Sequence, residues 1–147
     1  MRSNSSVINV YKKNNIKSEV ATQLLYGDTF KKIKKRGSWI KIKIDLDHYK
    51  GFIKNKKFPP NQKDTHKICK LYANLYFKPN LKSKIKKKIS FGSKVKIIEK
   101  KDNFYKFDNL WIKKKNLKKI NYKTKDIFKN IKKFIKQLRR KSLAIQK

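Results

Sequence analysis

The sequence predicts an all-β protein in which two small tandem barrels precede an amphipathic helix. Three observations predict it: a repeat at an offset of 65 residues, short segments of alternating apolar residues, and a final segment with helical spacing. The length of 147 residues suits two domains of about 60 residues each. We expect a first barrel at 7–57, a Pro-containing linker at 58–64, a second barrel at 65–120 and the helix at 124–141.

The repeat matches residues of similar chemistry along both copies. Asn9–Ser18 aligns with Asn74–Ser83, and Leu24–Gly27 aligns with Ile89–Gly92. Further apolar positions follow in the same register, where Phe30, Ile33, Trp39, Ile40 and Ile42 meet Val95, Ile98, Phe104, Tyr105 and Phe107. Lysine matches are common by chance in so basic a chain, but apolar, aromatic and glycine matches are not. The repeat therefore indicates two copies of one small fold.

Each copy has the pattern of short antiparallel strands. Apolar residues alternate with lysines in Trp39–Ile44, which places one face on a core and the other in water. Turn-forming residues at Gly37-Ser38 and Asp102-Asn103 predict a hairpin in each copy. Gly27 and Gly92 each precede a strand, where a tight turn often requires positive φ. Strands spaced in this way are typical of small barrels.

The C-terminal segment changes to helical periodicity. Its apolar residues are spaced for one helix face, and Thr124 is the expected N-cap. The stripe consists of Ile127, Phe128, Ile131, Phe134, Ile135 and Leu138. The opposite face is rich in lysine. Two interpretations stay open: the stripe packs on a barrel, or the helix lies on an anionic membrane or a nucleic acid.

The charge is strongly basic, with 44 Lys and Arg against 9 Asp and Glu and a formal net charge of +35. Such a surface attracts polyanions, and the attraction weakens as salt rises. Almost all of the excess is lysine, whereas nucleic-acid readers often use arginine for bidentate contacts. Lysine spread evenly among many Asn and Ile is also typical of a codon bias toward A and T. A basic module that binds nucleic acid or another polyanion is therefore the alternative function.

Nothing in the chain resembles a membrane span or an export signal. No run of 18 apolar residues is present, so no transmembrane helix is expected. Met1–Val10 is polar and lacks the apolar centre of a signal peptide. We expect a cytoplasmic location, with association with the cell envelope as the other option.

Three segments of the first copy resemble a known family. They are Val20–Asp28, Gly37–Trp39 and Asp47–Ile53. They are similar to the "TQLLYGE", "GW" and "DGYVGYV" stretches of the first bacterial SH3 (SH3b) domain of NlpC/P60 cysteine peptidases. The second copy resembles the next domain of those proteins, the bacterial dipeptidyl-peptidase SH3 domain. Its landmarks are Thr65-His66, Leu75-Tyr76, Pro79, Leu81-Lys82, Ser90–Gly92, Trp111-Ile112 and Asn116-Leu117.

The resemblance implies two SH3-like barrels that, in the family, precede a papain-like domain that cleaves peptidoglycan peptides. Asp126–Ile135 is similar to the first helix of that catalytic domain. The family then continues with "GxPYLWGG" and a "DCSG" nucleophile, whereas this chain reads Lys136–Arg140. We therefore expect a non-catalytic targeting and substrate-recognition part, truncated or split from a catalytic domain.

The chemistry of the side chains agrees with a non-enzyme. A cysteine peptidase needs a thiolate, a His base and a group that orients the His. Cys69 is the only thiol and is expected to be a buried strand residue, and His48 and His66 are the only imidazoles. One Cys and two scattered His do not supply a four-ligand zinc site. We expect no catalytic residues, no metal and no cofactor.

The resemblance also implies a ligand site. In related peptidases the first barrel helps to recognise the free amino end of a muramyl peptide, and an amine requires acid and hydroxyl acceptors nearby. Asp28, Asp47 and Tyr49 match the corresponding motifs and are the candidate ligand-binding residues. Tyr26 and Trp39 are expected to pack, and Asp28 has the alternative role of supporting a turn. The expected partners are muramyl peptides or peptidoglycan fragments, and a separately encoded catalytic domain.

Overall fold

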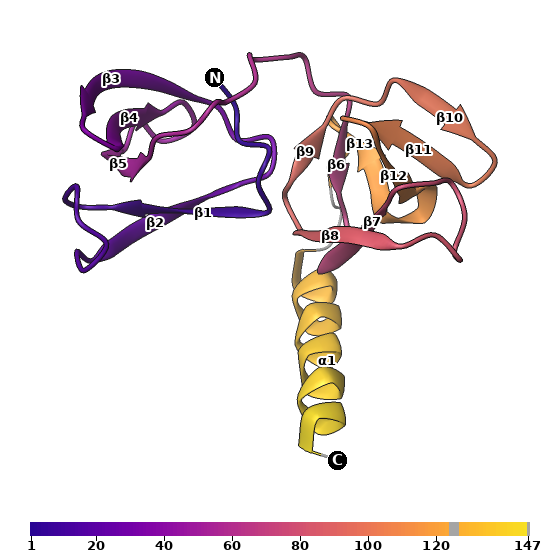
Figure 1. The fold of residues 1–147 in the computed structure, drawn as a ribbon. Coiled ribbons are helices and arrows are strands. Elements are labelled where there is room, and N and C mark those ends of the chain that lie inside the picture. The colour runs from indigo at the N-terminus through magenta and orange to yellow at the C-terminus, as the bar shows by residue number, and fades with distance from the viewer. Residues whose placement is uncertain (124–126, 147) are drawn as a thin grey trace.

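The computed structural model describes residues 1–123 and 127–146, which form two β lobes and one helix (Figure 1). The first lobe is one antiparallel sheet in the order β2-β1-β5-β4-β3. Its strands are β1 (Val7–Tyr11), β2 (Val20–Leu25), β3 (Phe30–Arg36), β4 (Trp39–Ile44) and β5 (Lys50–Lys54).

The second lobe contains two antiparallel sheets. Their orders are β10-β11-β12-β7-β8 and β13-β6-β9. Its elements are β6 (His66–Ile68), β7 (Tyr72–Tyr76), β8 (Ile85–Ser90), β9 (Lys94–Val95), β10 (Glu99–Lys101), β11 (Phe104–Phe107), β12 (Leu110–Lys113), the 3₁₀ turn η1 (Lys114–Asn116) and β13 (Leu117–Lys119). The all-β class is confirmed, although the hydrogen-bonded sheets of the described residues do not close into complete barrels.

The two lobes repeat the same local contacts at the offset seen in the sequence. The β1–β2 and β7–β8 pairs are both antiparallel, and both shift register just before their last pair, at Tyr11 and Tyr76. Tyr11 packs edge-on against Trp39 with ring centroids 5.4 Å apart, and Tyr76 packs in the same way on Phe104 at 5.8 Å. Equivalent aromatic pairs thus anchor equivalent strands in both lobes.

The glycine turns before the third strand of each copy also correspond. Gly27 has φ of +88° and Gly92 has φ of +87°, so the expected positive φ is confirmed at both. This left-handed region is open to glycine and strained for most other residues.

Each lobe has its own apolar core. In the first lobe the fully buried side chains are Val10, Leu24, Phe30, Ile40, Ile42 and Ile53. In the second lobe they include Ile68, Leu75, Ile89, Val95, Phe107 and Ile112. Inward-facing positions alternate with lysines along the strands, which explains how so basic a chain can still form two cores.

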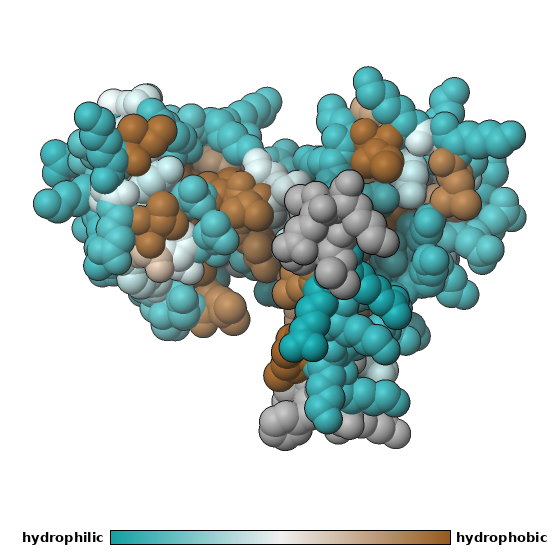
Figure 2. Space-filling view, turned by 90° about the horizontal axis from the view of Figure 1, so that it is seen from below, coloured by the Kyte–Doolittle hydropathy of each residue, from teal (hydrophilic) through white to brown (hydrophobic). Residues whose placement is uncertain are grey.

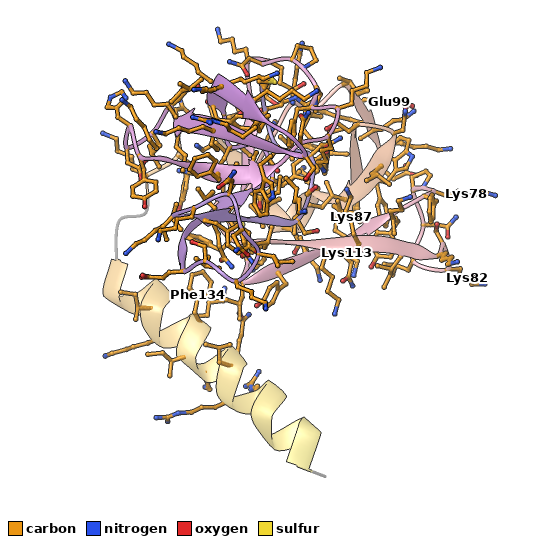
Figure 3. The ribbon with its side chains drawn as sticks, turned by 60° about the vertical axis from the view of Figure 1, so that its left-hand side comes forward. Lys78, Lys82, Lys87, Glu99, Lys113 and Phe134 are labelled. Atoms are coloured by element: carbon orange, nitrogen blue, oxygen red, sulfur yellow. The ribbon has the colours of Figure 1, made fainter. Side chains whose placement is uncertain are left out.

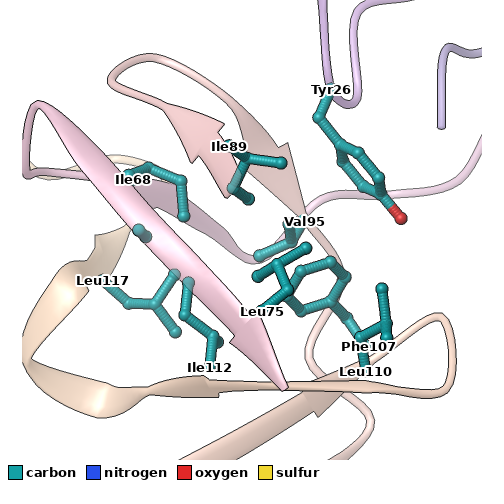
Figure 4. Packing of buried hydrophobic residues seen from close by; sticks show 10 residues of the cluster. Tyr26, Ile68, Leu75, Ile89, Val95, Phe107, Leu110, Ile112 and Leu117 are labelled. Carbon is teal, nitrogen blue, oxygen red and sulfur yellow. The ribbon is translucent and has the colours of Figure 1, made fainter. Parts of the chain in front are cut away.

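Tyr26 belongs to the first lobe by sequence but packs in the core of the second. It is 1% exposed, and its ring lies edge-on to Phe107 with centroids 5.6 Å apart. Figure 4 shows the ring entering the second-lobe cluster from the neighbouring lobe. The expectation that Tyr26 packs is confirmed, and its burial joins the two cores. A buried aromatic side chain contributes about 1.5–3 kcal/mol.

A charged cluster strengthens the same junction. The Asp108 carboxylate accepts hydrogen bonds from Nη1 and Nη2 of Arg2, at 2.9 Å and 3.0 Å, and from the Tyr26 hydroxyl. Burial alone would raise the pKa of Asp108, but the hydrogen bonds from Arg2 and Tyr26 outweigh it and hold the pKa below its ordinary value. The Lys94 N–H also donates to the Tyr26 carbonyl oxygen at 2.9 Å. The lobes are therefore held as one body.

The helix α1 (Ile127–Gln146) extends away from the second lobe (Figure 1) and runs past the expected end at residue 141. The expected N-cap, Thr124, lies outside the described residues. Phe134 lies toward the end of α1 that approaches the β lobes (Figure 3), and it packs on Phe91 of the second lobe with ring centroids 4.8 Å apart.

The rest of the described stripe is open to solvent. Ile131, Ile135 and Leu138 are 48%, 46% and 51% exposed. Figure 2 shows brown hydrophobic atoms along one side of α1 and teal hydrophilic atoms along the other. Packing of the stripe on a lobe is thus confirmed at Phe134 and wrong at these three residues.

Candidate functional site

A small pocket lies at the junction of the two lobes and contains one of the predicted ligand residues. Its volume is about 230 Å³. Asp28, Thr29, Ile44, Asp45 and Leu46 line it from the first lobe, and Lys94 lines it from the second.

Asp28 follows β2 in the turn that Gly27 makes possible. Its Oδ2 atom accepts a hydrogen bond from the Leu25 N–H at 2.8 Å, and its Oδ1 atom lies 3.8 Å from Nζ of Lys94. Burial raises the pKa of the Asp28 carboxyl, the Leu25 N–H and the Lys94 ammonium lower it, and the charge of Asp47 raises it further. Asp28 therefore supports the turn and also presents a carboxyl group to the pocket.

Asp47 and Tyr49 lie in and after the turn between β4 and β5, outside the residues that line the pocket. The exposed Asp47 accepts a hydrogen bond from the Tyr49 N–H at 3.0 Å through Oδ1. Between them His48 takes a positive φ of 61°, which shapes the turn. Tyr49 is half-buried and packs against the first-lobe core. The charge of Asp47 thus acts on Asp28, whereas Tyr49 packs against the first-lobe core.

The pocket gathers negative charge in a chain that has little of it. The chain has 9 acidic residues, and Asp28, Asp45 and Asp47 all belong to this region. The Asp45 N–H donates to the Thr29 carbonyl oxygen at 3.1 Å, which holds the two pocket walls together. Carboxyl groups around a small opening are suited to a positively charged amino group.

Sequence reasoning missed part of the pocket. Asp45 stands two positions before Asp47, so the local density of acids in a basic chain was a usable signal. Lys94 comes from the other lobe, and its position depends on how the lobes dock. No pattern within either copy predicts that contact.

Cys69 and His66 lie in the second lobe, apart from this pocket, whereas His48 lies beside Asp47 in the β4–β5 turn. Cys69 comes just after β6, which ends at Ile68, and it is partly exposed, so the expectation of a buried strand cysteine is wrong. Its Sγ atom lies 3.7 Å from the Lys115 carbonyl oxygen. Nδ1 of His66 lies 2.8 Å from the Thr65 hydroxyl.

No group of three or more His, Cys, Asp or Glu in residues 1–123 and 127–146 could hold a metal ion. Within the same residues, no helix has the length and apolar character needed to span a membrane.

The first lobe is similar to a known family of domains. Residues 10–58 match the family described as the bacterial dipeptidyl-peptidase SH3 domain. The sequence analysis predicts this domain type for the second copy, at 65–120, whereas the match lies in the first copy. The domain type of the second copy stays a prediction. None of the curated proteins matches the chain.

A solved structure supplies the fold of a larger part of the chain. The chain is similar to an NlpC/P60 family protein from Bacillus cereus ATCC 10987, with a TM-score of 0.66 and 16% sequence identity. The match covers 84% of this chain but only 56% of that chain. The SH3-like fold and the resemblance to the SH3b domains of NlpC/P60 proteins are confirmed, and the SH3b domain is a non-catalytic accessory domain.

Proposed function

We propose that this chain, whose first lobe is a bacterial SH3 domain of the dipeptidyl-peptidase type, is the targeting and substrate-recognition part of an NlpC/P60-type peptidoglycan peptide hydrolase. Its ligand is the free amino end of a muramyl peptide or of a related peptidoglycan fragment. It works beside a catalytic NlpC/P60 domain and at the cell envelope.

The observation that carries the proposal is the acidic pocket at the lobe junction. Asp28 and Asp45 line it, and the charge of Asp47 acts on Asp28. An ammonium group gains charge-assisted hydrogen bonds from such carboxylates, and it competes with the Lys94 ammonium, which stands 3.8 Å from Asp28. At 3.8 Å the Lys94 contact is weak enough for a ligand amine to replace it.

The rigid junction supports the proposal as well. A recognition site gains affinity when its groups are held in place before the ligand arrives. Asp28 follows directly after Gly27 and Tyr26, and the Tyr26 carbonyl accepts the Lys94 N–H at 2.9 Å. The hydrogen bond that joins the lobes therefore also fixes Asp28 and Lys94 on the two sides of the pocket.

A titration with defined variants tests the proposal. The probe is a tripeptide of the peptidoglycan stem with a free terminal amine, and binding is followed by calorimetry. Asp28→Asn keeps an oxygen that can accept the Leu25 N–H but removes the charge. We expect Asp28→Asn to weaken binding about tenfold or more, as loss of a charged hydrogen bond implies.

Asp102→Asn is the matched control, because Asp102 is an exposed acid in the β10–β11 turn of the second lobe. It removes the same charge without changing the pocket, so we expect wild-type affinity. An absence of saturable binding in the wild type, or an equal loss in the control, would show that the assigned pocket is wrong.

A further inference from the structure

We propose that a groove on the second lobe binds an extended acidic peptide that carries an aliphatic side chain. The groove has a volume of about 750 Å³ and lies among η1, β13, the β10–β11 turn and the β7–β8 connection. It shares no lining residue with the acidic pocket at the lobe junction.

The floor of the groove is apolar. Leu81, Phe104, Tyr105 and Leu117 contribute to it. Leu81 is 64% exposed, so it presents most of its side chain to an incoming ligand. The Lys114 N–H donates to the Asn103 carbonyl oxygen at 2.8 Å, which fixes η1 against the β10–β11 turn and keeps the groove formed.

The rim of the groove is cationic. It consists of Lys113, Lys114 and Lys115 at the end of β12 and in η1, and of Lys118 and Lys119 in β13. None of these lysines has a carboxylate partner among the described residues. Burial together with the charges of Lys100 and Lys119 lowers the pKa of His66, which also lines the groove. The rim is thus a concentration of positive charge without carboxylate partners in the described part of the chain, and the Lys118 ammonium lies over the Tyr122 ring at 5.1 Å.

Lysines continue beyond this rim onto the adjoining connection. Lys78 and Lys82 flank Leu81 in the β7–β8 connection and point outward into solvent (Figure 3). A long anionic ligand that leaves the groove on this side meets further cations, and these cations steer its approach.

An acidic peptide fits the groove better than a single-stranded nucleic acid does. Base recognition of that kind relies on open aromatic faces for stacking. The Lys100 ammonium lies over the Tyr105 ring at 4.9 Å, and the His66 ring meets it edge-on at 5.8 Å. Phe104 is 8% exposed and packs against Tyr76. The aromatic rings of the floor are therefore already engaged, whereas the space beside Leu81 suits an aliphatic side chain.

An extended peptide suits a groove that is lined by both apolar side chains and lysines. Successive side chains of an extended peptide point to opposite sides, so residues two positions apart share a side. A leucine can then rest on the floor while the neighbouring acidic side chains reach the rim lysines. Charge complementarity across such a site supplies specificity as well as attraction.

The test is fluorescence polarisation with a labelled peptide of alternating Glu and Leu, with labelled polyglutamate and single-stranded DNA as comparisons. The groove variant is Lys114→Glu with Lys119→Glu, at two exposed positions of the rim. The matched control is Lys31→Glu with Lys35→Glu, at two exposed positions of β3 in the first lobe. Both variants change the net charge equally, so their difference isolates the groove.

We expect the groove variant to weaken binding of the Glu-Leu peptide about tenfold relative to the control, since each reversed charge loses one attraction and adds one repulsion. Leu81→Ala should weaken the Glu-Leu peptide severalfold and leave polyglutamate unchanged. Ile16→Ala, at an exposed isoleucine in the β1–β2 connection of the first lobe that lines neither the groove nor the acidic pocket, should change neither.

Three outcomes would overturn the proposal. Equal losses in the groove variant and its control would reduce the effect to overall charge. No loss in Leu81→Ala would remove the aliphatic contact. Tighter binding of the DNA, lost in the groove variant, would assign the groove to nucleic acid.

Discussion

Replacing Gly27 with alanine tests whether the two lobes form one body. A Cβ atom at Gly27 would overlap the Lys94 carbonyl oxygen and lie 2.9 Å from the carbonyl carbon, both of which belong to the other lobe. The opposing atoms are backbone, so no side-chain rotation relieves the contact. The lobes must move apart, and the hydrogen bond from the Lys94 N–H to the Tyr26 carbonyl oxygen is lost with the movement.

The cost can be worked from the contacts at the junction. An L-residue at this positive φ costs about 1–2 kcal/mol, and a lost hydrogen bond costs about 1 kcal/mol. Partial withdrawal of Tyr26 from the second-lobe core costs about 1–2 kcal/mol more. Gly27→Ala should therefore reduce the free energy of unfolding by about 3–5 kcal/mol, a large part of the stability of a small protein.

Gly92→Ala is the matched control. Its φ is +87°, nearly the same as that of Gly27, but the nearest atom to a new Cβ is Leu25 Cδ1 at an ordinary 3.6 Å. We expect it to cost only the backbone strain, about 1–2 kcal/mol.

The assay uses the tryptophan in each lobe, Trp39 in β4 and Trp111 in β12. Urea unfolding of Trp39→Phe and Trp111→Phe backgrounds reports each lobe separately. The two transitions should coincide in the parent protein and separate when Gly27→Ala is added. Equal destabilisation by the two glycine variants, with coincident transitions in both, would refute the docking argument.

Three further predictions concern the junction, the helix and the thiol. Asp108→Asn should reduce the free energy of unfolding by about 2 kcal/mol. Because the pKa of Asp108 is lowered in the folded protein, the stabilisation by its carboxylate is complete above the ordinary value of 3.8 and is lost as pH falls through the folded value. The fall of Tm at acid pH should therefore be smaller in the variant than in the wild type. Phe134→Ala should weaken the docking of α1 by about 0.5–1.5 kcal/mol and speed amide exchange in α1 but not in the lobes, because it removes the contact with Phe91. Ile135→Ala, at a residue that is 46% exposed, should leave amide exchange in α1 unchanged, and unchanged exchange in Phe134→Ala would contradict the Phe91 contact. The isolated chain should not hydrolyse γ-D-glutamyl peptides, and any turnover that Cys69→Ala abolished would overturn this prediction.

The sequence predicted local structure well because local structure depends on nearby residues. The alternation in Trp39–Ile44 appears as β4, and the glycines at 27 and 92 take the positive φ that the turn requires. The apolar spacing after residue 126 appears as α1.

Contacts between the lobes could not be predicted in the same way. Arg2 precedes β1 and Asp108 lies in the β11–β12 turn, 106 positions later, and nothing in either segment indicates that they pair. The position of Tyr26 in the sequence predicts a core residue of the first lobe, yet its ring is buried in the core of the second lobe. Lys94 lines the pocket only because the two lobes dock. The apolar stripe of α1 is exposed because the helix makes few contacts with the second lobe, and its sequence does not predict how many it makes.

Recognition of a free amine at the acidic pocket is the central claim, and acetylation of the ligand tests it most directly. The same stem tripeptide is titrated into the wild-type chain with its terminal amine free and with that amine acetylated. The pocket of Asp28 and Asp45 predicts saturable binding of the free amine and a loss of about tenfold or more on acetylation, because the ligand then has no charge to offer the carboxylates. Equal affinity for both peptides, or no binding of either, would contradict the account.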